Sequence, residues 1–451
     1  MREIKNYAYI ENLELYEYVA FPIYVIIIYL ISYYIQNKNI KKNPVYRYYT
    51  KGVLFKLLGA IIFCFVYIFY YKGGDTISYY ETSRSLTNLF LQKPADFLKV
   101  ILEKPSVENY FLFDGRTTGF PWPYMFYDTK TFFVAKLLVP FMVVSFQSYI
   151  LCSLLLSWIS FIGIWKLYLI LVENFKQLSF QLALAILFVP SVIFWGSGIL
   201  KDTITLSATC WMIYSIYNLF IMKRGLLKNS IIFLISGYVI VSVKPYIMIA
   251  LIPGAFIWIM HYRIVKIKNA FFRYSAMPFI FIAGFVLGFF ILSSATGFNL
   301  EKAFYEASEK QNDLKQSYYK GNTFDIGSYD YSVGGILSKA PNAILSGIFR
   351  PFIWESKTVM MLITGIENTL FLYLSLRILL GLKLKKLLRI IFNTPYILFS
   401  LSYSILFAFI IGMSTANFGA LVRFKIAFLP QFASAITILY YLVEYEKKKK
   451  V

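Results

Sequence analysis

The sequence predicts an all-α fold, a polytopic membrane helical bundle with about eleven transmembrane helices. Hydrophobic residues make up 59% of the 451-residue chain, and the mean hydropathy is +0.62. Only 15% of the residues are charged, against about 25% in ordinary soluble domains. Apolar runs long enough to span a bilayer recur along the chain. Because no linker separates a soluble part, we expect residues 1–451 to form a single membrane-embedded domain.

The predicted spans follow from the apolar runs, each read as a helix with ends good to a few residues. They are 19–36, 53–71, 149–172, 179–196, 203–221, 230–243, 246–260, 277–294, 363–380, 396–413 and 427–443. Spans 230–243 and 246–260 are separated by Lys244 and Pro245, which predicts a tight hairpin turn, because proline stops a helix and a lysine there needs water or a partner.

Basic residues set the predicted orientation. Five segments carry Lys and Arg with few or no acids, and the positive-inside rule places such segments in the cytoplasm. These are 37–52, 223–228, 263–273, 383–389 and the tail that ends in 447–450. Residues 72–148 and 295–362 carry both signs of charge, so we expect two large extracytoplasmic loops, an outer N-terminus and a cytoplasmic C-terminus.

This orientation holds only if the apolar segment 131–145 does not cross the membrane. The segment is short and carries Lys136 and Pro140 near its middle. We therefore expect a juxtamembrane or re-entrant helix within the first outer loop, where protein covers its backbone.

Composition also excludes several classes of function. The net charge of +22 would fit nucleic acid, but in so apolar a chain it marks cytoplasmic loops, so we expect membrane lipid and no nucleic acid as a partner. Cys64, Cys152 and Cys210 lie in apolar runs, which argues against disulfides and thiolate metal sites. His261 is the one histidine and lies in a basic loop, which excludes Ser-His-Asp hydrolysis and histidine zinc sites.

The first candidate motif is Lys72-Gly73-Gly74-Asp75, followed by Tyr79, Tyr80 and Glu81. Two glycines allow a sharp turn and a close approach of the backbone to a ligand. Asp75 would then lie at the mouth of the bundle, where water and an amphiphilic substrate both reach it. The alternative is that Asp75 only caps the next helix.

The second motif runs from Trp195 to Asp202, on the same predicted face of the membrane. Glycines at 196 and 198 again precede a charged pair, Lys201-Asp202, that opens a helix. The alternative is a lysine that extends to the interface and pairs with the aspartate beside it.

Basic and aromatic residues complete the candidate site. Arg350 ends an amphipathic segment, and Arg423 and Lys425 precede the last span. A planar guanidinium suits phosphate, although Arg350 has a structural alternative in a salt bridge to Glu355. Trp122, Tyr124 and Trp354 are candidate stacking platforms for sugars.

Carboxylates and cations on one membrane face suit transfer from a lipid pyrophosphate. A carboxylate can act as general base for the acceptor hydroxyl or hold a divalent cation, and cations stabilise the leaving phosphate. A transporter would instead carry ionisable residues at mid-membrane depth and broken helices. A non-catalytic scaffold is the third class considered.

The order of these motifs resembles membrane glycosyltransferases of the GT-C superfamily. The Gly74-Asp75-x-x-x-Tyr79 start and the late Arg423 also resemble polysaccharide polymerases of the EpsG/Wzy type. The resemblance implies a polyprenyl-linked sugar donor, a catalytic role for Asp75, a second acidic position at Asp202, and Lys201 near a position where the polymerases often carry arginine. Threonine follows Asp75 where GT-C enzymes carry a second acid, so the metal, Mg or Mn, stays open.

The resulting hypothesis is a membrane glycosyltransferase or repeat-unit polymerase for surface polysaccharide. It would use an undecaprenyl-linked sugar on the outer face of the cytoplasmic (inner) membrane, with Asp75 and Asp202 as the catalytic residues. The predicted substrate-binding residues are Lys201, Arg350, Arg423, Lys425, Tyr79, Tyr80, Glu81, Trp122 and Trp354. The alternative is a transporter or flippase of a lipid-linked glycan. The sugar and the oligomeric state stay open.

Overall fold

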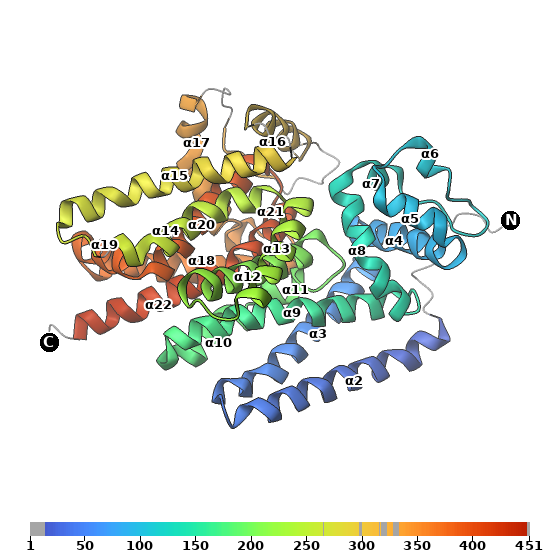
Figure 1. The fold of residues 1–451 in the computed structure, drawn as a ribbon, viewed down its shortest axis with the longest axis horizontal. Helices are drawn as coiled ribbons and strands as arrows, with labels where there is room; N and C mark the ends of the chain where they lie inside the picture. The colour runs from blue at the N-terminus through green and yellow to red at the C-terminus, as the bar shows by residue number, and fades with distance from the viewer. Residues whose placement is uncertain are drawn as a thin grey trace. The chain divides into compact units, whose positions relative to one another are not determined.

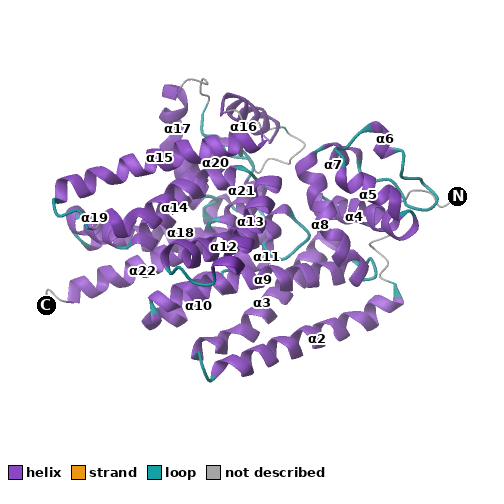
Figure 2. Ribbon diagram, in the orientation of Figure 1, coloured by secondary structure: helices purple, strands orange, loops and turns teal. Residues whose placement is uncertain are grey.

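The computed structural model describes residues 14–264, 266–296, 300–314, 316, 323–327 and 333–448. Every regular element in these ranges is a helix (Figure 2), as the sequence predicts. The chain divides into two compact units. Unit 1 comprises Met1–Lys166, Val192–Cys210 and Ser242–Lys244, and unit 2 comprises Leu167–Ser191, Trp211–Val241 and Pro245–Val451.

Seven helices of the described residues are long and apolar enough to cross a membrane. They are Leu15–Ile40, Pro44–Tyr70, Tyr149–Asn174, Lys201–Ile221, Leu226–Val243, Val359–Gly381 and Pro395–Ser414. A bent pair, Phe418–Ala427 and Leu429–Lys448, passes the same test together, with a bend of 68° between its halves. The membrane helices are therefore present, but the predicted count of eleven is not confirmed.

The predicted span 179–196 is not one helix. Helix α10 (Ser179–Leu187) ends before Phe188, and a separate short helix, α11 (Pro190–Trp195), follows. Pro190 has no N–H to continue the backbone ladder and disfavours helical geometry in the residue before it. The break is therefore encoded locally, although hydropathy alone runs through it.

Two further predicted spans lie within helices longer than predicted, residues 246–260 in α14 (Tyr246–Ile264) and residues 277–294 in α15 (Ala270–Thr296). Among the described residues, their apolar stretches are Tyr246–His261 and Ser275–Phe290, and neither is counted among the seven candidate spans. The last predicted span, 427–443, lies almost wholly in α22 (Leu429–Lys448), which has 20 residues but meets the criteria for a membrane span only together with the helical segment before its bend.

Unit 1 begins with two long helices joined by a 3-10 turn. Helix α2 (Leu15–Ile40) packs on α3 (Tyr49–Phe65), with η1 (Pro44–Tyr48) between them, and α3 continues into the π-helical turn η2 (Val66–Tyr70). Both helices are almost wholly apolar, as membrane contact requires.

Five helices follow where the sequence analysis places the first outer loop, 72–148. They are α4 (Asp75–Gln92), α5 (Pro94–Leu102), α6 (Val107–Tyr110), α7 (Pro123–Tyr127) and α8 (Thr129–Val144). This segment, which we call the helical layer, has its own core made of Leu86, Leu89, Val100, Phe113, Phe126, Phe132, Ala135 and Val139. The predicted loop is therefore a packed structure that can hold side chains in fixed positions.

Helix α8 is the segment that the predicted orientation requires not to span. Its 16 residues correspond to about 24 Å, short of the roughly 30 Å of hydrocarbon, and it is not among the candidate spans. The Lys136 ammonium donates to the Ile101 carbonyl oxygen at 2.8 Å, and burial lowers its pKa. A half-buried lysine is thus bound to the end of α5 within the helical layer.

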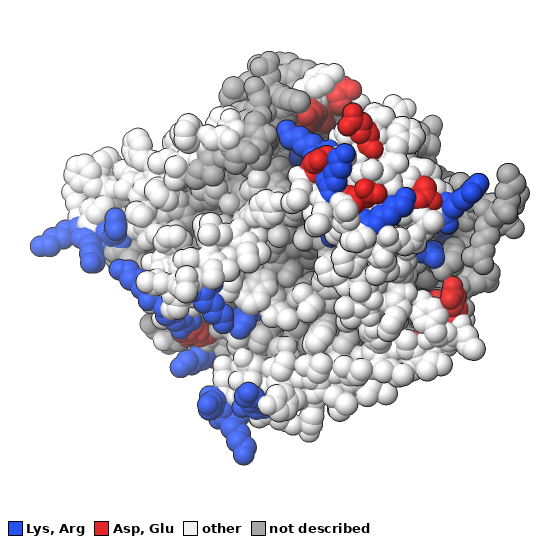
Figure 3. Space-filling view, turned by 45° about the vertical axis from the view of Figure 1, so that its right-hand side comes forward, with Lys and Arg blue, Asp and Glu red and all other residues white. Residues whose placement is uncertain are grey.

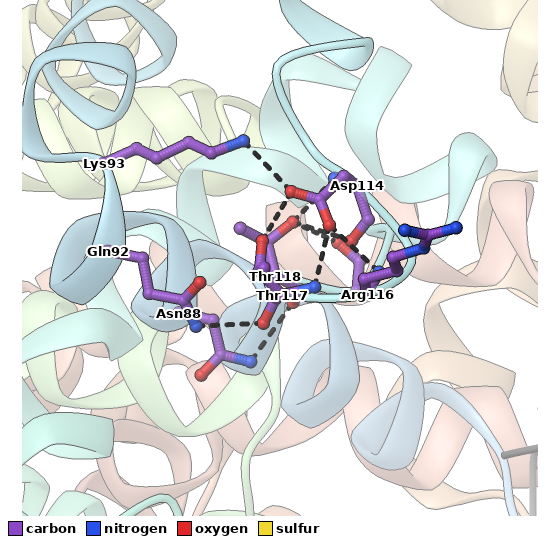
Figure 4. A network of polar contacts seen from close by, with 8 residues as sticks. Asn88, Gln92, Lys93, Asp114, Arg116, Thr117 and Thr118 are labelled. Atoms are coloured by element: carbon purple, nitrogen blue, oxygen red, sulfur yellow. Dashed lines mark hydrogen bonds and ion pairs between the residues drawn. The ribbon is translucent and has the colours of Figure 1, made fainter. Parts of the chain in front are cut away.

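A polar network fixes the loop between α6 and α7 (Figure 4). The Asp114 carboxylate accepts from the N–H groups of Arg116 and Thr117 at 2.9 and 2.7 Å and pairs with Lys93 at 3.0 Å. The Thr117 hydroxyl and these partners hold the pKa of Asp114 well below its usual range. Asn88 donates to the loop carbonyl of Thr118 at 3.1 Å, which ties the loop to α4.

Unit 2 is built around α14, α20 (Pro395–Ser414) and α22. Helix α14 packs against α15 and α20, α17 (Val333–Phe349) packs against α20, and α22 packs against α10, α18 (Val359–Gly381) and α20 (Figure 1). Helices α17 and α20 approach closely through Gly347 and Gly412, because a Cβ on either glycine would overlap backbone of the other helix.

The remaining helices belong to both units. They are α9 (Tyr149–Asn174), η3 (Lys176–Leu178), α12 (Lys201–Ile216), η4 (Tyr217–Ile221), α13 (Leu226–Val243), α16 (Leu300–Leu314), η6 (Ile353–Glu355), α19 (Leu384–Asn393), α21 (Phe418–Phe424) and η7 (Lys425–Ala427). The predicted second outer loop, 295–362, thus contains α16, α17 and η6. The rest of that predicted loop lies outside the described residues, between these helices or in the first turn of α18, and residues 1–13 lie outside the described residues.

Charged side chains are unevenly distributed over the surface. Figure 3 shows one patch in which acidic and basic side chains lie together, and other patches that are almost entirely basic, with a largely uncharged surface around them. Mixed and basic-only patches are the pattern that the positive-inside rule associates with the two sides of a membrane.

Candidate functional site

Lys201 and Asp202 open helix α12 in unit 1, and each takes a different partner. The Lys244 ammonium donates to Asp202 Oδ1 at 2.5 Å. The Lys201 ammonium donates to Thr131 Oγ1 at 2.6 Å and lies 3.4 Å from Asp128 Oδ2. The alternative in which Lys201 and Asp202 pair with one another is therefore not the arrangement in the structure, since neighbouring residues at the start of a helix point in different directions.

The Lys244–Asp202 ion pair is buried, with side-chain exposures of 5% and 2%. Lys244 follows the last residue of α13 and precedes Pro245, where the sequence predicts a turn. Two buried opposite charges are tolerated because each compensates the desolvation of the other, and loss of either leaves an uncompensated charge. The partner that Lys244 requires is thus an aspartate 42 residues away in the sequence.

Asp128 caps α8 beside this pair. Its carboxylate accepts from the N–H groups of Lys130 and Thr131, each at 3.2 Å, and from the Thr131 hydroxyl. Burial raises the pKa of Asp128, but the Thr131 hydroxyl and the Lys201 ammonium outweigh it and hold the pKa below the usual value. Asp128 is therefore ionised at neutral pH and remains partly open to solvent.

Asp75 is the exposed end of the same arrangement. It opens α4 directly after Gly74 and interacts electrostatically with Lys201, which also feels the charge of Lys244. Asp75, Asp128, Lys201, Asp202 and Lys244 thus form one group, which we call the unit 1 charge cluster. It runs from a buried ion pair, through the half-buried Lys201, to two solvent-accessible carboxylates.

The glycines of the two motifs have different structural roles. Lys72, Gly73 and Gly74 have φ values of 50°, 142° and 103°, so this turn uses conformations that glycine adopts at little cost. Gly198, by contrast, is required for packing, because a Cβ there would overlap the Phe63 ring. The Gly196 carbonyl accepts from the buried Lys56 ammonium at 2.5 Å. The first motif therefore turns through residues with positive φ, whereas the turn at residues 196–200 of the second motif does not use its glycines in this way.

Two of the predicted aromatic ligands are core residues. Tyr79 and Tyr80 are 4% and 3% exposed, and the Tyr80 hydroxyl donates to the Gln147 carbonyl oxygen at 2.8 Å. Direct contact of these rings with a substrate is therefore not available in this structure. Their position on the inner face of α4 follows from helical periodicity, because Asp75 and Glu81 occupy more exposed positions.

Glu81 and Trp122 are linked instead. The Trp122 indole Nε1 donates to Glu81 Oε2 at 2.5 Å, and burial raises the pKa of Glu81. Trp122 is partly exposed, and its ring lies 6.1 Å from the ring of the exposed Tyr124. The helical layer thus presents two aromatic rings beside a carboxyl group, an arrangement suited to contact with a sugar.

The predicted basic ligands of the second half belong to unit 2. Arg350 Nε lies 3.0 and 3.2 Å from the two carboxylate oxygens of Glu355, and its guanidinium lies over the rings of Phe324 and Phe418. The structural alternative for Arg350 is therefore the one observed. Trp354 is 78% exposed and stacks on Phe352.

Lys425 is not placed to bind a phosphate. Its residue is fully buried, and its ammonium donates to the Ile348 carbonyl oxygen at 2.6 Å, to Asn368 Oδ1 at 2.8 Å and to the Arg350 carbonyl oxygen at 3.3 Å. This corrects the prediction, because the flexible lysine stem turns inward and binds the end of α17. Arg423 is half-buried in the last turn of α21.

Asp75, Lys201 and Asp202 are therefore brought together in unit 1, and Arg350, Arg423 and Lys425 are described within unit 2. Sequence reasoning missed Asp128 and the role of Lys244. The pattern Asp128-x-x-Thr131 before an apolar run is a helix N-cap signal that could have identified Asp128. In the part of the chain that the structure describes, no three His, Cys, Asp or Glu residues are grouped to hold a metal ion.

Comparisons of the chain with protein-family models, curated proteins and solved structures found no match. The class of protein therefore rests on the fold, which is that of a helical membrane protein.

Proposed function

We propose that the protein is a membrane glycosyltransferase or glycan polymerase that uses a polyprenyl-linked sugar at the unit 1 charge cluster. The observation that carries the proposal is the gathering of three carboxylates and two lysines beside the helical layer. One end of the cluster is exposed and the other is fixed by a buried ion pair, so the charged groups are held rigidly where solvent meets the bundle.

In the proposed reaction, Asp75 and Lys201 of the unit 1 charge cluster have different roles. The Asp75 carboxylate accepts the proton of the acceptor hydroxyl, whose oxygen then attacks the anomeric carbon of the donor sugar. The bond from that carbon to the pyrophosphate oxygen breaks, and polyprenyl pyrophosphate leaves. The Lys201 ammonium stabilises the charge that grows on the leaving phosphate, and Asp128 and the Lys244–Asp202 pair hold Lys201 in place.

The helical layer supplies the surface for the sugar. Trp122 and Tyr124 offer ring faces, and Glu81 accepts hydrogen bonds. Placing this layer outside requires an outer N-terminus and a cytoplasmic C-terminus in the cytoplasmic membrane, which the basic-only segments support.

Replacing Asp75 with Asn tests the proposal. The general base is worth about 10²- to 10⁴-fold in rate, so a host whose own copy is deleted and replaced by Asp75→Asn should lose glycan chain growth. The variant should reach the membrane in normal amounts. Glu108→Gln, which changes an exposed acid on α6 of the same layer, is the matched control and should leave chain growth unchanged. Normal polymer length with Asp75→Asn would end the catalytic assignment.

A transporter or flippase of a lipid-linked glycan is the second candidate, favoured by one observation. One predicted span is broken in unit 2, at 188–189, a 68° bend precedes α22, and the buried charged residues Glu367 and Lys425 lie beside these two points. Discontinuous helices with buried charges are typical of transporters. The lipid-linked species that accumulates on deletion separates the two: an unflipped intermediate on the inner leaflet supports transport, and an unpolymerised unit on the outer leaflet supports transfer.

A further inference from the structure

Glu367 is a buried acid within the candidate span α18 and takes no part in the proposed transfer reaction. The residue is 9% exposed. Its Oε1 accepts from the Ser191 N–H at 2.7 Å, and the Ser191 and Thr364 hydroxyl oxygens lie 3.0 Å apart beside it. One carboxyl oxygen is therefore fixed by the first turn of α11.

The second oxygen, Oε2, is buried and has no hydrogen-bond partner among the described residues. A carboxylate oxygen in an apolar interior without a donor is costly, because the free energy of hydration is lost and not replaced. A proton on Oε2 removes the charge and therefore this cost. Glu367 Oε2 is therefore the oxygen atom to which a proton would bind.

Lys425 opposes permanent protonation. Its ammonium attracts the Glu367 carboxylate electrostatically, while its own hydrogen bonds go to Ile348, Asn368 and Arg350. The ionised carboxylate is thus compensated by a nearby cation but not directly hydrogen-bonded by it. The Lys425 ammonium favours the ionised state of Glu367, and burial of Oε2 without a donor favours the neutral state. Because the two effects oppose each other, Glu367 can exchange between the two states.

Few other charges act on this carboxyl group. Two of the charged residues on the elements packed against α18 form the Arg350–Glu355 ion pair. The others are Lys339 within α17, Lys357 just before α18, and Arg377, Arg423, Glu444, Glu446, Lys447 and Lys448 near the C-terminal ends of their helices. Lys425 is therefore the charged neighbour on which the balance at Glu367 depends.

We propose that Glu367 is a reversible proton-binding site inside unit 2. The site connects α11, α18 and the bend before α22, so binding a proton weakens the attraction between α18 and Lys425 at that bend. This inference is independent of the transfer reaction proposed above, and it holds whether unit 2 supports a transferase or a transporter.

Infrared difference spectroscopy tests the proposal on the full-length protein in lipid vesicles. The probe is the proton alone: spectra recorded at acid and alkaline pH should differ by the C=O stretch of a protonated carboxyl group. Glu367→Gln should remove one component of this band, the contribution of Glu367, because glutamine keeps an oxygen for the Ser191 N–H but cannot titrate. Glu444→Gln, on the exposed end of α22, is the matched control and should retain the band.

Several outcomes would overturn the proposal. A carboxyl band unchanged by Glu367→Gln would show that another group titrates. A Glu367 band that stays constant over the whole pH range in which the protein is folded would show that binding is not reversible. A band abolished by sodium chloride but not by choline chloride would assign the site to a metal cation.

Two further variants keep the result interpretable. Lys425→Met should shift the band to higher pH, because it removes the cation that favours the ionised state. If Glu367→Gln proves unstable, Glu367→Asp should move the titration without abolishing it, and an unmoved titration would count against the assignment. Asp75→Asn should leave the Glu367 band unchanged, so failure of the proton site and failure of the transferase proposal are separately visible.

Discussion

Lys244 in unit 1 and Lys425 in unit 2 are both buried lysines, but they are neutralised in different ways. Lys244 forms a direct ion pair with Asp202, whereas Lys425 is bound by two backbone carbonyls and the Asn368 amide oxygen. Lys244 belongs to the unit 1 charge cluster, which reaches solvent at Asp75. Lys425 binds the backbone carbonyls at the C-terminal end of α17. The role of a buried lysine therefore cannot be inferred from its burial and residue type alone; it depends on the groups to which the ammonium is bound.

Lys56 shows that carbonyl-bound lysines occur in both units. Its buried ammonium donates to the Val192 and Gly196 carbonyl oxygens at 3.1 and 2.5 Å, at the end of α11. The last carbonyls of a helix lack backbone donors, and a cation there also interacts favourably with the helix dipole. A lysine near a membrane boundary thus has a structural use that competes with any phosphate-binding role.

The largest effect is expected for Lys244→Met. Removing one partner of a buried ion pair leaves Asp202 uncompensated, which costs about 3–5 kcal/mol of unfolding free energy. Thermal or denaturant unfolding in detergent would measure it. The double variant Lys244→Met/Asp202→Leu should recover most of the loss, because it removes both charges. A double variant as unstable as the single one would show that the charges do not act as a pair.

A smaller effect is expected for Lys425→Met. Lys425 binds dipoles rather than an opposite full charge in direct contact, so the loss should be that of charged hydrogen bonds, about 2–3 kcal/mol. The same unfolding measurement applies. Lys425→Arg is a useful comparison, since it keeps the charge but not the geometry. A loss equal to that of Lys244→Met would remove the distinction between the two lysines.

The smallest effect is expected for Asp128→Asn, and it should depend on pH. The folded protein holds the pKa of Asp128 below its ordinary value of 3.8, so this carboxylate stabilises the fold above that pH and ceases to do so as the pH falls through the lowered pKa. Because the side chain is 46% exposed, the gain at neutral pH is only about 0.5–1 kcal/mol. Wild type and variant should converge in stability at pH values below the lowered pKa of Asp128. If wild type and Asp128→Asn differ in stability by the same amount at neutral pH and at acid pH, ionisation of Asp128 is not the cause of the difference.

Much of the fold could be predicted from local sequence. Apolar runs predict the seven helices of spanning length, and the short, charged segment at 131–145 predicts a helix that is not among them. The break at Pro190 and the bend before α22 were missed, because hydropathy averages over a window and does not register where the backbone ladder is interrupted.

The candidate site was predictable only in part. Asp75 and Asp202 were identified because charges beside apolar runs are conspicuous, and the structure links both to Lys201 or Lys244. Their partners were not identified, and Lys425 was assigned to the solvent side although it is buried. A lysine side chain has four methylene groups joined by rotatable bonds, so it can point into the protein or toward solvent, and the neighbouring residues in the sequence do not determine the direction.

The sequence alone determines that this chain is helical, apolar enough for a membrane and basic in particular connecting segments, because helical periodicity and hydropathy depend on residues close together in the chain. Only the tertiary structure decides which charges compensate one another. Asp202 meets a lysine 42 residues later, and Glu367 meets a backbone N–H 176 residues earlier. No local pattern encodes such pairs, because they arise when helices pack and the cost of burying a charge selects whichever partner lies within reach.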